Sequence, residues 1–297
     1  MPKNNQVAVV GCANAGKSTL VNKLVQKNVS IVSPMAQTTR NAIPNLFSNL
    51  ILWDTPGILK PKNKLDKFLI DEVNYSIKKS CIILFLIDST KKINSQLEEI
   101  CCYLNKFKEK KIILVYSKKD LIKDKNSFEL LKKTITNFLP NIYKTFTFDL
   151  HNDNLYELIF EIQNLSNDLV SNEDDFSIDE NWKDDLLIKD LVRQQIINHS
   201  FQEVPHSSSV IIEQKKYDEV KNIFHIYCVI IVEKESQKKI IIGKNGLKIK
   251  QIGIDARKAI SEIYDCKINL KLFCKVKKDW RNDDYLLKSF GYKKWQK

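Results

Sequence analysis

The sequence has no hydrophobic run long enough to cross a membrane. The chain has 297 residues, and its longest uninterrupted apolar stretch, from Cys81 to Ile87, is only seven residues long and ends at Asp88. A transmembrane helix needs about 20 such residues, whereas a run of this length is typical of a buried β-strand. The first residues, Met1 to Gln6, also lack the apolar core of a signal peptide. We therefore expect an unprocessed, intracellular protein.

Paired cysteines are missing as well. The seven cysteines are scattered, and none belongs to a C-x-x-C pair. The four histidines show no ligand spacing with cysteine or carboxylate residues. This pattern argues against a structural zinc site. It predicts reduced thiols in the cytoplasm.

Arginine is scarce, with four residues among 48 basic ones, although the net charge is +12. Lysine, asparagine and isoleucine are all heavily used, and a biased genome explains that as well as function does. The position of the charge is more informative. Residues 240–297 hold 15 Lys/Arg against 6 Asp/Glu. We therefore expect the C-terminal part to contact a polyanion, either RNA or an acidic membrane surface.

An acidic segment divides the chain. From Asp168 to Asp185, eight residues are acidic and Lys183 alone is basic. We expect a solvated linker, or the start of a helix, between a domain at 1–167 and another at 186–297. In the first domain, short apolar runs alternate with helix-like stretches, as in an α/β fold with a mostly parallel sheet covered on both faces. These runs lie at 7–10, 50–53, 81–87 and 112–116, and an antiparallel edge hairpin is expected through a turn at 48–49.

The second domain has a different pattern, a smaller α+β one. We expect a helix at 187–196, strands near 210–212, 226–232 and 267–277, and helical segments around Ile240 and at 254–264, the two being separated by a glycine-bearing stretch at 243–253. In the last strand, apolar residues alternate with mostly basic ones. One face of that strand is therefore expected in the core and the other in solvent.

A phosphate-binding loop follows the first predicted strand. Residues 11–18 read GCANAGKS, which matches GxxxxGK[ST], with a helix expected after them. Backbone N–H groups and the start of that helix surround phosphates in such loops. Lys17 is expected to contact the β- and γ-phosphates, and the Ser18 hydroxyl to bind Mg²⁺. The predicted nucleotide-binding residues here are Gly11, Cys12, Ala13, Asn14, Ala15, Gly16, Lys17, Ser18 and Thr19.

A second motif, Asp54-Thr55-Pro56-Gly57, follows the strand at 50–53. We expect Asp54 to face the Mg²⁺ shell and the Gly57 N–H to approach the γ-phosphate. Within Gln37-Thr38-Thr39-Arg40, Thr39 is the expected third Mg²⁺ ligand, with Thr38 as the alternate. The predicted catalytic set is therefore Lys17, Thr39, Asp54 and Gly57.

The residue after this motif is Ile58, which we place in the nucleotide-binding set together with Asp54 to Gly57. A glutamine that orients the attacking water usually stands at or near this point. Isoleucine has no hydrogen-bonding group for that task. We expect slow intrinsic hydrolysis.

Ser117-Lys118-Lys119-Asp120 follows the strand at 112–116 and resembles NKxD, the motif that reads guanine. The Asp120 carboxylate can accept from N1–H and the exocyclic amine of guanine, whereas adenine leaves that charge unpaired. Leaving a buried polar group unpaired costs about 1–3 kcal/mol, so GTP should bind at least about tenfold more tightly than ATP. Ser117 stands where asparagine is usual and predicts the loss of one contact to the base or the phosphate loop.

The second domain contains a GxxG sequence formed by Gly243, Lys244, Asn245 and Gly246, and Lys248 and Lys250 follow it. Glycines allow an RNA backbone to approach closely, and the adjoining helix start favours phosphates. We expect these six residues to bind RNA.

Together these motifs resemble the Era family of ribosome-associated GTPases over nearly the whole chain. The resemblance is carried by GCANAGKSTLVNKL, AQTTR, DTPG, SKKD, QKKIIIGKNGLKIKQIGIDARK and LKSFGY. It implies a P-loop, Ras-like GTPase domain followed by a type II KH domain that binds near the 3′ end of small-subunit ribosomal RNA. It also implies a role in 30S assembly, GTP/GDP and Mg²⁺ as ligands, and some peripheral contact with the inner face of the cell membrane. No obligate protein partner is implied.

The resemblance further implies a monovalent-ion role for Asn14, as in K⁺-dependent relatives. Two stretches depart from the family pattern. Phe146-Thr147-Phe148-Asp149 occupies the loop that usually reads S-A, which puts backbone support of the base in doubt. The segment from Arg40 to Asp54 is short, which suggests a trimmed hairpin.

Two other functions fit the same residues. One is a catalytically weak scaffold that binds ribosomal RNA and holds GTP loosely. The other is a GTPase that works at the membrane, with its basic C-terminal face directed to lipid.

Overall fold

The computed structural model describes residues 5–27, 29–32, 38–168, 179–201 and 203–292. The chain forms two compact units that divide between residues 178 and 179, except that Asn63–Phe68 groups with the second unit. Among the described residues, no helix combines the length and apolar character needed to cross a bilayer.

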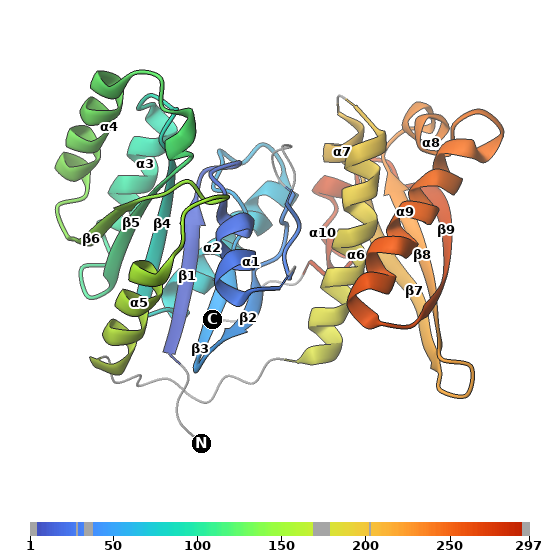
Figure 1. The fold of residues 1–297 in the computed structure, drawn as a ribbon. Coiled ribbons are helices and arrows are strands. Elements are labelled where there is room, and N and C mark those ends of the chain that lie inside the picture. The colour runs from blue at the N-terminus through green and yellow to red at the C-terminus, as the bar shows by residue number, and fades with distance from the viewer. Residues whose placement is uncertain (1–4, 28, 33–37, 169–178, 202, 293–297) are drawn as a thin grey trace. The chain divides into compact units, whose positions relative to one another are not determined.

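A six-stranded sheet forms the centre of the first unit (Figure 1), in the order β2-β3-β1-β4-β5-β6. The strands are β1 (Asn5–Gly11), β2 (Ile43–Phe47), β3 (Leu50–Asp54), β4 (Ile82–Asp88), β5 (Lys111–Ser117) and β6 (Ile142–Thr147). Only β2 pairs antiparallel, with β3 across a turn at Ser48 and Asn49. The mostly parallel sheet and its edge hairpin are therefore confirmed.

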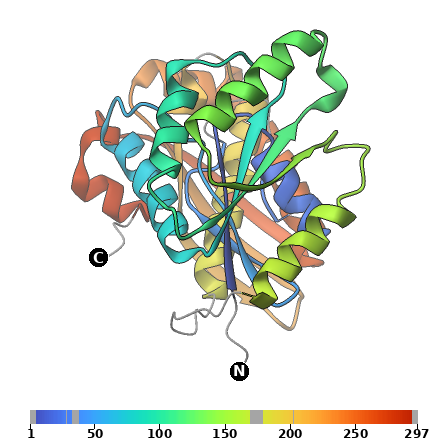
Figure 2. The ribbon, with the colours of Figure 1, turned by 90° about the vertical axis from the view of Figure 1, so that its left-hand side faces the viewer.

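Helices cover both faces of this sheet (Figures 1 and 2). Alternate residues of β1 enter two different cores: Val7 and Val9 pack with α1 and α5, whereas Ala8 and Val10 pack with α2, α3 and α4. This alternation follows from the two-residue period of a strand, and a strand buried on both faces reads as continuously apolar. The helices are α1 (Lys17–Val25), α2 (Lys64–Lys79), α3 (Ser95–Leu104), α4 (Lys125–Phe138) and α5 (Tyr156–Asp168), with a short 3₁₀ turn, η1 (Lys119–Leu121).

The expectation of a loop at 146–149 is wrong in part. Phe146 and Thr147 end β6, which pairs parallel with β5. Three residues in the middle of this edge strand, Tyr143 to Thr145, are exposed, so its sequence shows no apolar run. Hydrogen-bonded pairing with β5, rather than a pattern in its own sequence, makes this segment a strand.

The second unit contains a three-stranded sheet in the order β7-β8-β9, in which β7 pairs antiparallel and β9 parallel with β8. Helices α6 and α9 lie side by side on one face of this sheet (Figure 1). The expected order of helix, two strands, two helices and strand is confirmed, with short helical segments added. The elements are α6 (Glu180–His199), α7 (Val204–Ser207), β7 (Ser209–Asp218), β8 (Ile223–Val232), α8 (Glu235–Ile242), η2 (Lys244–Gly246), α9 (Leu247–Tyr264), β9 (Lys267–Val276), η3 (Trp280–Asn282) and α10 (Asp284–Ser289).

Two expected boundaries need correction. The acidic segment 168–185 is not a linker throughout, because α6 begins at Glu180 and the Asp179 carboxylate accepts from the Trp182 N–H at 3.1 Å. Acidic side chains stabilise the start of a helix, which explains their concentration here. Residues 169–178 lie outside the described part of the chain. The separation at 243–253 is also too long: α9 starts at Leu247, and Gly253 packs inside it near Leu272.

Candidate functional site

The phosphate loop between β1 and α1 requires glycine at two positions. A Cβ atom at Gly11 would lie 2.4 Å from the carbonyl oxygen of Leu86 on the neighbouring strand β4. Gly16 has φ +94°, and Asn14, where the turn also reverses, has φ +62°. Both angles lie in the left-handed region that favours glycine and tolerates asparagine. The loop therefore wraps closely against the sheet before α1 begins.

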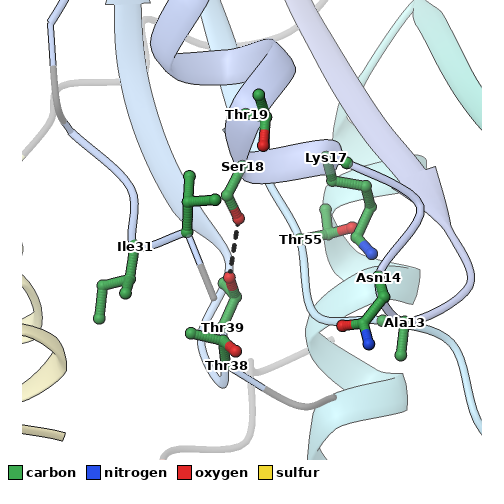
Figure 3. A pocket seen from close by; sticks show the side chains of 12 residues that line it. Ala13, Asn14, Lys17, Ser18, Thr19, Ile31, Thr38, Thr39 and Thr55 are labelled. Carbon is green, nitrogen blue, oxygen red and sulfur yellow. Dashed lines mark hydrogen bonds between the residues drawn. The ribbon is translucent and has the colours of Figure 1, made fainter. Parts of the chain in front are cut away.

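Lys17, the first residue of α1, points into this loop (Figure 3). Its Nζ lies 2.9 Å from the carbonyl oxygen of Cys12 and 3.3 Å from that of Gly11. Burial lowers the pKa of Lys17, and the nearby Asp54 carboxylate opposes that shift. The ammonium therefore lies where bound phosphates can replace carbonyl oxygens as its partners.

Three oxygen-bearing side chains from separate segments meet beside Lys17. The Ser18 Oγ donates to Asp54 Oδ2 at 2.8 Å. It also lies 3.1 Å from Thr39 Oγ1 (Figure 3). Asp54 ends β3, whereas Thr39 precedes β2. The structure thus brings together the three residues that we predicted as Mg²⁺ ligands. Thr38 lines a pocket together with Lys17, Ser18 and Thr39. Gln37 lies outside the described residues.

Asp54 has no exposed surface, and burial raises its pKa, while hydrogen bonding from Ser18 and the charge of Lys17 oppose the shift. Its second oxygen, Oδ1, is buried and has no hydrogen-bond partner among the described residues. A buried, unpaired carboxylate oxygen is costly unless a cation or donor satisfies it. Two hydroxyls and a carboxylate form the all-oxygen donor set that Mg²⁺ prefers, so these residues fit the ion.

The Asp54-Thr55-Pro56-Gly57 turn is anchored to the sheet and packed against the phosphate loop. The Thr55 hydroxyl donates to the Val9 carbonyl at 2.6 Å. A Cβ atom at Gly57 would lie 2.8 Å from Ala13 Cα, so only glycine allows this approach. Pro56 is buried within the same turn.

Ile58 continues the turn beside the phosphate loop. Its N–H donates to the Gly11 carbonyl at 3.1 Å, and its carbonyl accepts from Gln96 Nε2 at 2.6 Å. Gln96, in α3, therefore fixes the segment that carries Gly57, and sequence reasoning missed it. No local signal identifies it because the contact depends on how α3 packs.

Ser117 ends β5 and is fully buried. Its Oγ donates to the Ala15 carbonyl at 2.7 Å. Serine therefore keeps a direct link from the guanine motif to the phosphate loop, so the expected loss of a contact does not apply to that link. This hydrogen bond forms because the end of β5 lies close enough to the phosphate loop for the short serine side chain to span the gap.

Lys118 adopts a left-handed backbone conformation with φ +59°, and its Nζ lies 2.6 Å from Asp88 Oδ2. Asp88 ends β4 directly beside Ser117 in the parallel register. Burial acts to raise the pKa of Asp88, but hydrogen bonds from Lys118 and Thr90 outweigh it and lower the pKa. Asp88 thus holds the guanine motif in place, a contact that sequence reasoning missed although it identified this acid at the end of an apolar run.

The rest of the guanine motif borders the loop after β6. The Lys119 N–H donates to the Phe148 carbonyl at 3.2 Å, and the Asp120 carboxylate, in η1, is exposed. Within the loop, the Asp149 N–H donates to Asp153 Oδ2 at 2.9 Å. Lys23 of α1 donates to the Asp153 carbonyl at 2.6 Å. Hydrogen bonds to the loop's backbone groups, from side chains as well as from the backbone, therefore order this loop despite its unusual sequence.

The GxxG segment of the second unit connects α8 to α9. Gly243 and Gly246 have φ +71° and +75°, and Asn245 between them has φ +51°. A Cβ atom at Gly243 would lie 2.6 Å from Lys248 Cβ, whereas one at Gly246 would meet nothing within 4 Å. Gly243 is therefore required by packing, while Gly246 leaves an open surface. Lys244 and Lys250 are exposed and Lys248 is half-buried near the start of α9, a suitable arrangement for phosphates.

Comparisons with known proteins give the same two parts. A family model described as a 50S ribosome-binding GTPase matches residues 6–118, and a KH domain model matches residues 203–281. The curated GTPase Era of Ureaplasma parvum is 39% identical over 296 residues, with 97% of each chain covered. GTPase Era of Clostridioides difficile is 36% identical over 299 residues, with 98% of this chain and 99% of the relative covered.

Two solved structures match the whole chain. One is Era in complex with MgGDPNP and nucleotides 1506–1542 of 16S ribosomal RNA, with a TM-score of 0.84. The other is a variant of Aquifex aeolicus Era bound to GDP·AlF₄⁻, with a TM-score of 0.85. Each is 31% identical, and 98% of this chain and 99% of that chain are covered.

Proposed function

Because the chain belongs to the Era family of GTPases, we propose that it is a GTP-hydrolysing switch that binds small-subunit ribosomal RNA through its KH domain and assists assembly of the 30S subunit. The observation that carries the proposal is the meeting of Ser18, Thr39 and Asp54 beside Lys17, in a chain whose second unit carries a GxxG loop.

For the nucleotide, each residue has a definite task. Ser18, Thr39 and Asp54 would hold Mg²⁺, which when bound neutralises charge on the β- and γ-phosphates. Lys17 exchanges its carbonyl partners for phosphate oxygens. The Gly57 N–H can face the γ-phosphate because no side chain blocks it.

Hydrolysis is slow in this proposal. Ile58 lies where a water-orienting group is needed, and both of its backbone polar groups are already hydrogen-bonded, to Gly11 and Gln96. Asn14 lines the nucleotide pocket, and we extend to it the monovalent-ion role of K⁺-dependent relatives. Activity measured in KCl and in NaCl tests that role.

For RNA, support comes from the KH family match and from the relative that was solved with a segment of 16S ribosomal RNA, the small-subunit RNA. The GxxG loop, with Lys244, Lys248 and Lys250 beside it, is the part of this chain suited to a phosphate backbone. We place the protein in the cytoplasm, and peripheral contact with the cell membrane stays a prediction.

The test measures GTP affinity and turnover with and without an RNA that matches the 3′ end of 16S ribosomal RNA. We expect GTP binding at micromolar concentration or tighter, and slow turnover that the RNA alters. Ser18→Ala serves as the control that removes a Mg²⁺ ligand. GTP binding no tighter than millimolar would leave the catalytically weak scaffold as the better explanation, provided that RNA still binds.

Liposome sedimentation separates the ribosomal role from the alternative of a GTPase that works at the membrane. Acidic vesicles and the RNA fragment compete for the protein in one assay. Preference for RNA supports the ribosomal role. Preference for vesicles supports a GTPase at the membrane.

A further inference from the structure

The sheet of the second unit has two unlike faces. On one face, Ile226, Cys228 and Ile230 of β8 pack into the core with α6 and α9. Because successive residues of a strand point to opposite faces, the intervening residues of β8 lie on the other face. That second face carries six side chains that we call the basic sheet face: Lys216, Tyr227, Lys267, Lys271, Phe273 and Lys275.

The strand register places these residues together. Tyr227 pairs with Lys271, and the neighbouring pair on the same face is Val229 with Phe273. On the other side of β8, Lys216 pairs with His225, which in turn hydrogen-bonds Asn269 of β9 at 2.9 Å. Side chains directly opposite each other across a sheet share a face. All three strands therefore contribute to one surface.

This face exposes positive charge and the aromatic ring of Phe273, and the ring of Tyr227 is half-buried beside them. The Phe273 side chain is 51% exposed and lies between Lys271 and Lys275 along β9. The Lys271 Nζ lies 5.1 Å from the centre of the Tyr227 ring. All four lysines are exposed, and one carboxylate, that of Glu213, pairs with Lys275 at 2.7 Å.

This combination matches the chemistry of unpaired RNA. Bases stack on flat aromatic rings, and lysines pair with the phosphates between them. An acidic lipid surface would use the lysines but has no base to stack on the rings. The basic sheet face is separate from the GxxG loop, because the helices that this loop connects, α8 and α9, pack against β9 from the core side of the sheet.

We propose that the basic sheet face is a second RNA-binding surface, which takes unpaired nucleotides next to those bound at the GxxG loop. Since β9 is the edge strand of its sheet, an RNA strand can pass around that edge from the helices to the basic sheet face. Two surfaces on one domain then bind the same RNA strand, so a longer RNA binds more tightly than the GxxG loop alone allows.

The test compares two single-stranded RNAs in the full chain. The short RNA has about six nucleotides, enough for a GxxG loop that holds four. The long RNA contains the same sequence extended at both ends. Phe273→Ala is expected to weaken binding of the long RNA about tenfold, as for loss of one stacked base, and to leave the short RNA unchanged.

Further variants keep the result interpretable. Phe273→Tyr retains the ring and should restore long-RNA binding, whereas Phe273→Leu should not. Lys271→Gln should lower the slope of log affinity against log salt by roughly 0.7 for the long RNA alone. Phe160→Ala is the matched control, because Phe160 is 63% exposed but lies on α5 of the other unit.

The proposal is overturned if Phe273→Ala binds the long RNA as wild type does, or if it weakens both RNAs equally. It is also overturned if Phe273→Ala changes binding to acidic vesicles and not to RNA. If wild type binds neither RNA, the proposed function fails together with this inference. If wild type binds both and Phe273 has no effect, only the second surface is excluded.

Discussion

Replacing Asp88 by asparagine tests whether the guanine motif depends on a residue outside it. Asp88, at the end of β4, pairs with the Lys118 ammonium and is itself held by Thr90: Lys118 Nζ lies 2.6 Å from Asp88 Oδ2, and the Thr90 hydroxyl donates to Asp88 Oδ1 at 2.6 Å. Asp88→Asn preserves size and most hydrogen-bonding capacity but removes the charge. Lys118 then loses the partner that fixes its position before nucleotide binds.

The expected loss is moderate. A hydrogen bond to a charged group contributes about 1.5–3 kcal/mol, but the Lys118 side chain is 33% exposed, so solvent screening reduces this value. We expect about 1 kcal/mol, which is roughly fivefold weaker GTP and GDP binding. Turnover at saturating GTP should stay unchanged, since Asp88 contacts neither the predicted Mg²⁺ ligands nor Gly57. Titration with a fluorescent GTP analogue and a turnover assay measure the two quantities separately.

A matched control is Glu129→Gln, which removes the partner of Lys132 in an ion pair on α4 of the same unit. It should leave affinity unchanged. The reasoning is refuted if Asp88→Asn binds GTP as tightly as wild type, or more tightly. Tighter binding would mean that Asp88 competes with the nucleotide for Lys118.

Other predictions follow from single contacts. Asp54→Asn should raise the melting temperature of the nucleotide-free protein and abolish hydrolysis. The fold raises the pKa of Asp54, so the ionised carboxylate destabilises the fold as the pH rises from the ordinary pKa of an aspartate to this raised pKa. No rise in melting temperature at neutral pH would contradict this. Ser117→Ala leaves the Ala15 carbonyl unpaired and should weaken GDP binding about five- to tenfold in a titration, and unchanged affinity would show that the link is dispensable. Ile58→Gln should raise unstimulated phosphate release, whereas loss of all hydrolysis in Ile58→Ala would reveal a role that the geometry does not show. Gly243→Asp together with Gly246→Asp should abolish RNA binding in a gel-shift assay while GTP affinity stays constant, and RNA binding that survives would place the groove elsewhere.

Much of the first unit could be predicted because its signals are local. Fully buried strands such as β4 and β5 read as continuous apolar runs, and the glycines of the phosphate loop follow from backbone angles that few other residues adopt. Edge strand β6 carried no such signal, since its middle residues are exposed and pairing with β5 alone orders them. The sequence left open whether the acidic segment is a linker or the start of a helix, because acidic residues that cap a helix look the same as those of a solvated linker.

Local sequence patterns were enough to predict the two-part organisation, the phosphate loop, the Asp54 motif and the GxxG loop, because each depends on neighbouring residues and a short-range backbone conformation. Which distant residues meet became visible in the folded chain alone. Ser117 reaches Ala15, Asp88 holds Lys118, and Lys271 lies over Tyr227 because strand register brings these segments together. Register depends on the packing of whole sheets, which no short stretch of sequence specifies.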